Sequence, residues 1–231
     1  MYLYNNFLKL KPTRWGTWLQ RMRASAEWKI IRRSAPTQGS FLEIGPGHGV
    51  MAEIVRETGF SYLAVESNGN IARSIYESGF QVCRACVPPL PFCSRSIGIV
   101  YAAHVIEHLP DSFTALLFAQ EVHRILREDG IFFISAPDVR SFSWHFWDAD
   151  YTHTFPVSAR RLRQMLSDAN FEIISEIYFS GPIQGPVSAL MSFMAKILPS
   201  EPLGISRELG ERVTRLRLTF LRNICVLAHK R

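Results

Sequence analysis

The stretch FLEIGPGHGVMAEIV, Phe41 to Val55, decides the fold. It places a short apolar run before three glycines at alternate positions, and a run with apolar residues at helical spacing after them. Glycines let a backbone approach a ligand closely, and the first N–H groups of a helix lack partners within it. The stretch therefore predicts a strand, a ligand-binding loop and a helix, in that order.

Two carboxylates and one missing glycine narrow the class of ligand. The dinucleotide fingerprint G-x-G-x-x-G requires a third glycine at position 50, where this chain has Val50. Glu43, on the strand before the loop, suits a cationic or amino-bearing ligand better than a pyrophosphate. Glu66, at the end of the next apolar run, can accept hydrogen bonds from ribose hydroxyls. These features predict a ligand that contains adenosine but no phosphates.

Strand-like and helix-like segments alternate through the middle of the chain. The apolar runs SFLEIG, SYLAVES, SIGIVYAA and GIFFISAP are separated by helical patterns over residues 50–58, 71–78 and 112–126, and FEIISEIYF and NICVLAH follow. Gly59, Gly79 and Gly130 fit the position just past a helix end, where a positive φ is needed. Such alternation predicts a parallel sheet with helices on both faces.

At these residues the chain resembles the class I S-adenosylmethionine-dependent methyltransferases. The resemblance covers roughly residues 40–179 and rests on EIGPGHG, AVES, LPF, AAHVIEHLPD and VHRILREDGIFFISAPD. It implies an α/β fold with a Rossmann-like, doubly wound, seven-stranded and mostly parallel sheet whose last strand is antiparallel. It also implies these cofactor contacts: Glu43, Gly45, Gly47 and Gly49 at the methionine end, Glu66 and Ser67 at the ribose, Cys86 and Val87 at the adenine, and Ala102 and His104 beside the sulfonium.

The chain departs from the family at Cys86 and Gly98, where members usually carry acidic residues. Losing the acidic residue at Cys86 removes a hydrogen bond to the adenine amino group, worth ~1 kcal/mol net. A weakened cofactor site follows, and a methyltransferase fold that no longer catalyses remains an alternative.

No metal site is expected from the sequence. His104 to His108 spells H-x-x-E-H, a zinc-protease pattern, but that chemistry needs both histidines on one helix face. Here an apolar strand enters the motif and Leu109-Pro110 follows it. The cysteines, which lack the second closely spaced pair of a zinc site, are Cys83, Cys86, Cys93 and Cys225. Their low number favours reduced thiols and a cytoplasmic location.

The aromatic stretch SFSWHFWDADYTHTF, which follows the run GIFFISAP, carries the acceptor-site candidates. Its DYTH segment resembles bacterial methyltransferases of surface-polysaccharide and other glycan pathways. Tyr151 and Trp147 are expected to bind substrate, and His153, two residues after Tyr151, is the first candidate base, with His108 second. Purely structural histidines remain an alternative, since positioning against a sulfonium can suffice.

The acceptor is expected to carry a hydroxyl, because AAHVIEH stands where base-amine methyltransferases commonly carry Asn-Pro-Pro-aromatic. The expected acceptor is a small molecule, a glycan or a lipid-linked anionic molecule. An RNA methyltransferase or RNA-binding protein is the alternative class, which a salt titration of RNA binding would separate.

The two ends of the chain are basic although the net charge is only +6. Residues 1–36 are expected to form an amphipathic basic helix that caps a methyltransferase domain at 37–231, with a helical insertion at 181–220. In that insertion Ser188, Ser192 and Lys196 make one thin polar stripe on an otherwise apolar helix. The insertion is expected to receive an acyl or polyprenyl chain at a peripheral membrane contact, without a transmembrane segment. A homodimer interface, or core packing within a monomer, are the alternatives.

Overall fold

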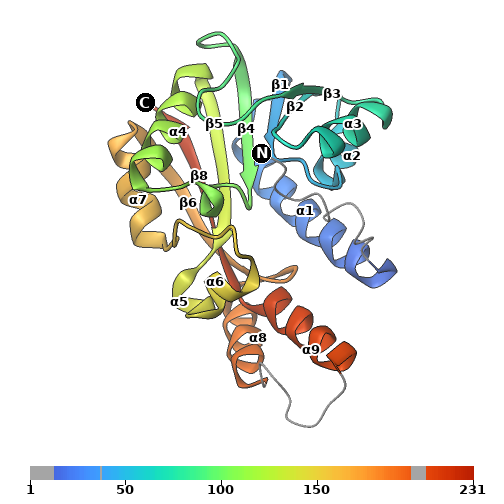
Figure 1. Ribbon diagram of the computed structural model, residues 1–231. Helices are drawn as coiled ribbons and strands as arrows, with labels where there is room; N and C mark the ends of the chain where they lie inside the picture. The colour runs from blue at the N-terminus through green and yellow to red at the C-terminus, as the bar shows by residue number, and fades with distance from the viewer. Residues whose placement is uncertain (1–12, 37, 199–206) are drawn as a thin grey trace.

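The computed structural model describes residues 13–36, 38–198 and 207–231 (Figure 1). The strands are β1 (Ser40–Ile44), β2 (Ser61–Glu66), β3 (Gln81–Arg84), β4 (Ile97–Ala103), β5 (Leu126–Pro137), β6 (Phe171–Ser180), β7 (Ile183–Gln184) and β8 (Arg222–Lys230). The helices are α1 (Arg14–Ser34), α2 (Val50–Arg56), α3 (Gly69–Glu77), the 3-10 helix η1 (Ile106–His108), α4 (Ser112–Ile125), α5 (Val139–Phe142), α6 (His145–Ala149), α7 (Ala159–Asp168), α8 (Gly185–Ile197) and α9 (Arg207–Phe220).

One sheet runs through the centre of the molecule in the order β3-β2-β1-β4-β5-β8-β6-β7. Strands β1 to β5 pair in parallel, whereas β8 pairs antiparallel with both β5 and β6. The predicted doubly wound sheet with an antiparallel last strand is confirmed. The short β7, which pairs antiparallel with the end of β6, is the strand beyond the seven expected.

Helices cover both faces of the sheet (Figure 1). One core cluster joins α1, α2 and α3 to the strands through side chains such as Trp28, Val55 and Ile75. The other joins α4 and α7 to the opposite face through side chains such as Phe118 and Leu166. Because both faces of the central strands β1 and β4 are buried, these strands are nearly continuous apolar runs, whereas the edge strand β3 is partly exposed.

Local signals in the sequence explain where several helices begin and end. Gly59 and Gly79 follow α2 and α3 with φ values of 80° and 85°, as expected. Ser158 caps α7 by accepting a hydrogen bond from the Arg161 N–H. The expectation for Gly130 was wrong, because α4 ends at Ile125 and Gly130 lies inside β5.

A separate group of helices stands at the carboxyl ends of the strands (Figure 1). A third cluster links α5, α6, α8 and the end of α9 through Phe142, Phe146, Ala195 and Leu221. The predicted helical insertion thus contains β7, α8 and α9, with residues 199–206 outside the described part. The domain boundaries at 36/37 and 181–220 remain predictions. Within the described residues, no helix is long and apolar enough to cross a membrane.

The burial of α8 is the reverse of what is usual for an amphipathic helix. Ser188 and Ser192 are 1% and 2% exposed, while Phe193 and Ile197 are 60% and 62% exposed. Ser188 donates a hydrogen bond to the Gly185 carbonyl, and Ser192 bonds the Ser141 hydroxyl at 2.9 Å. The two serines of the polar stripe therefore pack inward, while Lys196 and the broad apolar face point outward, which excludes core packing of that face in this structure.

Candidate active site

The glycine loop between β1 and α2 adopts a conformation that only glycine takes easily. Gly45, Gly47 and Gly49 have φ values of 72°, 53° and 75°. A Cβ at Gly45 would lie 3.0 Å from the Val105 side chain, and one at Gly49 would lie 3.0 Å from Ile75. Larger residues here would strain the backbone and crowd both neighbours. The loop is thus held at the carboxyl end of the sheet, where open α/β folds bind ligands.

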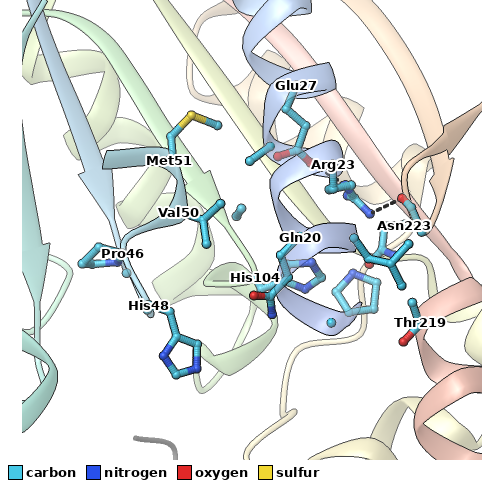
Figure 2. A pocket seen from close by; sticks show the side chains of 18 of the residues that line it. Gln20, Arg23, Glu27, Pro46, His48, Val50, Met51, His104, Thr219 and Asn223 are labelled. Atoms are coloured by element: carbon cyan, nitrogen blue, oxygen red, sulfur yellow. Dashed lines mark hydrogen bonds and ion pairs between the residues drawn. The ribbon is translucent and has the colours of Figure 1, made fainter. Parts of the chain in front are cut away.

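Two cavities meet at this loop. The β2 cavity, of about 530 Å³, is lined by Ile44, Gly45, Gly47, Val65, Glu66, Ser67, Ile71, Ala85, Cys86, Val87, Ala103, His104, Val105, Glu107, His108, Leu109, Asp150 and His153. The α1 cavity, of about 500 Å³, has a wall of α1 on one side and residues of the glycine loop and α2 opposite (Figure 2). Both cavities share Gly45, Gly47, Ala103, His104 and His153. A ligand in one cavity can therefore touch a ligand in the other.

Glu66 closes one end of the β2 cavity. Glu66 is 8% exposed, and its Oε1 accepts a hydrogen bond of 2.7 Å from the Asn68 N–H. Burial raises the pKa of Glu66 above its ordinary value, while the bond from Asn68 opposes that shift. Asn68 also caps α3 by accepting from the Asn70 and Ile71 N–H groups. The carboxylate is thereby fixed in orientation at the end of β2; its contact with a ribose stays a prediction.

A buried network joins α1 to the sheet behind the α1 cavity. Arg23 Nε donates to Glu27 Oε1 at 2.7 Å, and the Tyr101 hydroxyl donates to Glu27 Oε2 at 2.5 Å. Arg23 also donates to the Ser135 hydroxyl at 3.0 Å and stacks over the Phe179 ring at 4.6 Å. Burial alone would lower the pKa of Arg23, but the Glu27 carboxylate raises it. The guanidinium therefore stays protonated, and its charge is balanced by that of Glu27.

Glu43 lies deeper in the same cavity and is 4% exposed. The Tyr62 hydroxyl donates to its Oε2 at 2.5 Å. Desolvation by burial raises the pKa of Glu43 to about 8, although the Tyr62 hydrogen bond opposes that shift. With no ligand bound, this carboxyl is therefore mostly protonated at neutral pH.

His104 occupies the wall between the cavities in a strained backbone conformation, with φ of 58°. Non-glycine residues adopt this region rarely, and such strain concentrates at functional sites. Its Nδ1 lies 3.1 Å from Glu107 Oε1. Burial alone would raise the pKa of Glu107, but His104 and then His108 hold it below its ordinary value.

His108 and His153 lie together on the same wall, with ring centroids 4.9 Å apart. His153 Nδ1 lies 2.5 Å from the Phe146 carbonyl, and His108 Nδ1 lies 2.8 Å from the Thr152 hydroxyl. Burial lowers the pKa of His108. The two histidines named from the sequence as candidate bases are thus brought together from distant segments.

Most of the residues singled out in the sequence line these cavities: Glu43, Gly45, Gly47, Glu66, Ser67, Cys86, Val87, His104, His108 and His153. Gly49 instead is the N-cap residue before α2, and Ala102 is fully buried in β4 next to the lining residue Ala103. Tyr151 and Trp147 are 83% and 51% exposed and line neither cavity. Tyr151 diverges from His153 because residues 151–152 form a turn rather than an extended segment. The functional roles of all these residues remain predictions.

The sequence analysis expected the N-terminal helix to cap the domain, but it named none of the residues of α1 and α9 that line the α1 cavity. Gln20, Arg23 and Glu27 face the α1 cavity from α1, and Thr219 near the end of α9 and Asn223 on β8 line it as well (Figure 2). The only sequence signal was Glu27, the single acidic residue of a basic segment, spaced four residues after Arg23.

Comparisons with known proteins show the family of the chain. A family model described as a methyltransferase domain matches residues 12–176. A probable S-adenosylmethionine-dependent methyltransferase of Mycobacterium tuberculosis is 29% identical over 163 residues, which span 68% of this chain and 57% of the relative. One from Mycolicibacterium smegmatis is 28% identical over 136 residues, 57% of this chain and 51% of the relative. The chain thus spans only about half the length of these curated relatives.

Solved structures share the fold. The crystal structure of an S-adenosylmethionine-dependent methyltransferase from Archaeoglobus fulgidus superposes with a TM-score of 0.68 at 20% identity, covering 98% of this chain and 100% of that one. The crystal structure of the PH0226 protein of Pyrococcus horikoshii superposes with a TM-score of 0.63 at 11% identity, covering 92% of this chain and 91% of that one. The family match, which spans more than half of the chain, places this protein in the methyltransferase-domain family, among the class I S-adenosylmethionine-dependent methyltransferases.

Proposed function

We propose that this chain transfers the methyl group of S-adenosylmethionine to a hydroxyl group of a glycan or lipid-linked acceptor. The observation that supports it most is the pair of cavities that meet at Gly45, Gly47, Ala103, His104 and His153. A methyl transfer needs donor and acceptor held within contact distance in one enclosed site. Two adjoining cavities of similar volume, about 530 and 500 Å³, supply that arrangement.

The cofactor would lie with its adenosine in the β2 cavity. Glu66 and Ser67 would accept hydrogen bonds from the ribose hydroxyls, while Cys86 and Val87 would contact the adenine. The methionine part would cross the glycine loop toward Glu43 in the α1 cavity. The cationic amino group of methionine favours the ionised Glu43, so binding would release the proton that this carboxyl otherwise holds.

The acceptor would enter the α1 cavity. Gln20, Thr219 and Asn223 offer hydrogen-bonding groups there, while Arg23 is already neutralised by Glu27. The acceptor hydroxyl would then meet the methyl group at the wall formed by His104 and His153. Uncharged hydrogen-bonding groups set among apolar lining residues such as Leu19 and Phe142 suit the hydroxyls and the apolar ring faces of a glycan.

A lipid-linked acceptor is favoured by the outward face of α8. Val187, Leu190, Phe193, Met194 and Ile197 are 55–62% exposed and lie on one helix. Trp15 and Trp18, which stack on each other at 4.8 Å near the start of α1, are also 62% and 49% exposed. Apolar surface of this extent marks an interaction site. None of the residues lining the α1 cavity comes from α8. This helix would therefore contact the membrane surface rather than bind the acceptor.

The charges beside this apolar face point to an anionic bilayer surface. Lys196 is exposed on α8, and Arg212 and Arg215 are exposed on α9. Basic groups at the edge of an apolar helical face are the pattern of interfacial membrane binding. The helices α8 and α9 stand together at one end of the molecule, where α8 packs against the end of the sheet formed by β6 and β7 (Figure 1).

Methyl transfer is tested with S-adenosylmethionine labelled in the methyl group and an extract of lipid-linked glycans. Label is expected in the lipid-linked fraction and should survive mild alkali, because a methyl ether is stable where a methyl ester is not. Alkali-labile label, or label found only in amines, would contradict the hydroxyl assignment.

Membrane contact is tested by flotation with vesicles that contain anionic lipid. The double substitution Leu190→Ser and Phe193→Ser should weaken partitioning about thirtyfold, from roughly 2 kcal/mol of lost apolar transfer. Phe113, which is 68% exposed on α4, is the matched control, and Phe113→Ser should partition like the unmodified protein. Equal flotation of all three proteins would refute the membrane role of α8. The same role would be refuted if the unmodified protein did not float and formed a dimer in solution.

A further inference from the structure

Three potential metal ligands meet on the wall of the β2 cavity. Each of Glu107, His108 and His153 offers one ligand atom, and these atoms lie within 4.8 Å of one another. Ligand atoms around one zinc ion lie about 3.3 Å apart, so small side-chain movements would close the set. Glu107 and His108 belong to η1, whereas His153 comes from the loop after α6.

Hydrogen bonds to Nδ1 fix the tautomer of both histidines. The Phe146 carbonyl can only accept, so His153 Nδ1 carries the proton and donates at 2.5 Å. The Thr152 hydroxyl donates to Asp150 Oδ1 at 2.7 Å, so its oxygen accepts from His108 Nδ1. In both rings the lone pair is therefore on Nε2. Metal-binding histidines are typically oriented in this way, with the other ring nitrogen donating to a carbonyl or another acceptor.

The third ligand is a carboxylate with an unsatisfied oxygen. Glu107 is fully buried, and its Oε2 has no hydrogen-bond partner in the described part of the chain. Its other oxygen, Oε1, is bonded to His104 Nδ1. A buried carboxylate oxygen without a partner is costly, and each such group in a native protein calls for an explanation. A cation held by this oxygen and the two imidazoles would supply it.

We propose that Glu107, His108 and His153 bind a divalent transition-metal ion of the Mn²⁺ to Zn²⁺ series. Two imidazoles and one carboxylate select these ions over Mg²⁺ and Ca²⁺, which prefer oxygen ligands throughout, and they leave coordination positions open. The site differs from the zinc-protease pattern excluded from the sequence, because η1 is not an α-helix and the second imidazole comes from His153 rather than His104.

The role of this ion rests on the proposed function. The acceptor hydroxyl would occupy an open position and lose its proton to solvent, because a divalent cation lowers the pKa of a bound hydroxyl. The acceptor oxygen then forms a bond to the methyl carbon as the sulfur–carbon bond breaks, with the bond electrons remaining on sulfur. The products are a methyl ether and S-adenosylhomocysteine. The histidines would thus act through the ion rather than as bases.

The test is calorimetric titration of the chelator-treated full chain with ZnCl₂, MnCl₂ and MgCl₂, followed by metal analysis after dialysis. One Zn²⁺ or Mn²⁺ per chain is expected, with Mg²⁺ binding at least about 100-fold more weakly. His153→Asn keeps an N–H donor for the Phe146 carbonyl but lacks Nε2, so it should weaken Zn²⁺ binding at least about 100-fold. His123→Asn, at a surface position on α4, is the control and should bind like the unmodified chain.

Titration with S-adenosylhomocysteine separates the possible failures. If His153→Asn binds this ligand normally but loses the ion, the variant is folded and the metal site is supported. If Glu107→Gln fails to fold, His153→Asn still decides the question. Zinc binding that is absent, or equal in His153→Asn and the unmodified chain, would overturn the metal site. Normal binding of S-adenosylhomocysteine in that case would leave the proposed function standing, and its absence would count against that function separately.

Discussion

Replacing Glu43 with glutamine should remove a steep dependence of stability on pH. The pKa of Glu43 is raised from 4.5 to about 8 in the folded chain, mainly by burial. Between these values the folded state holds a proton that the unfolded state releases, so the free energy of unfolding falls as pH rises. A shift of three to four pKa units contributes about 5 kcal/mol to the free energy of unfolding at low pH. This contribution is fully lost once the pH passes the folded pKa. A glutamine side chain at this position would be neutral throughout and could still accept the hydrogen bond from Tyr62.

The measurement is urea unfolding of both proteins at intervals from pH 4.5 to pH 9. Subtracting the free energy of unfolding of the unmodified chain from that of Glu43→Gln cancels the other titrating groups. As the pH rises, the free energy of unfolding of the variant should increase relative to that of the unmodified chain by about 5 kcal/mol. The difference should then level off above pH 8. Glu77→Gln, at an exposed position on α3, should give a flat difference. A flat difference for Glu43→Gln as well would refute the protonated, buried carboxyl.

Three further predictions concern the ligand sites. Glu66→Ala should lose two hydrogen bonds from the ribose to a carboxylate, and calorimetry should show binding of S-adenosylhomocysteine weakened by ~2 to 4 kcal/mol; unchanged affinity would remove Glu66 from the site. His153→Ala should lower kcat by ~10² or more, while the affinity for S-adenosylhomocysteine is kept; full activity would show that positioning suffices. Gly45→Ala should weaken cofactor binding and destabilise the fold, because φ is 72° and the added Cβ would lie 3.0 Å from Val105; wild-type stability in thermal unfolding would contradict this.

The strands and the cofactor loop could be predicted because their signals are local. The alternation of apolar runs and helical patterns depends on burial of both faces of a parallel sheet, which the sequence records residue by residue. Glu66 was recognisable because it stands at the end of such a run, where strand β2 also ends. Gly130 misled because the polar residues before it are typical of a turn, whereas β5 begins at Leu126 through pairing with Ile97.

The rest of the site depends on contacts between distant segments. Arg23 on α1 is positioned by contacts with Ser135 on β5 and Phe179 on β6. No local sequence pattern reveals these contacts. His153 joins Glu107 only because the loop after α6 folds back, where the Thr154 and Phe155 N–H groups both donate to the Glu107 carbonyl. The inward turn of the serine stripe on α8 likewise required a partner on α5, Ser141. Sequence spacing singled out His153 and the serines of α8, but not the distant residues with which they pair.

Binding of the cofactor product tests the central claim most directly. Calorimetric titration of the full chain with S-adenosylhomocysteine should show one binding site per chain, and binding should release up to one proton at neutral pH as Glu43 ionises. The proton release is read from the dependence of the binding heat on the ionisation enthalpy of the buffer. Absence of binding heat with both S-adenosylhomocysteine and S-adenosylmethionine, together with binding of NAD, would contradict the assignment of the two cavities to methyl transfer.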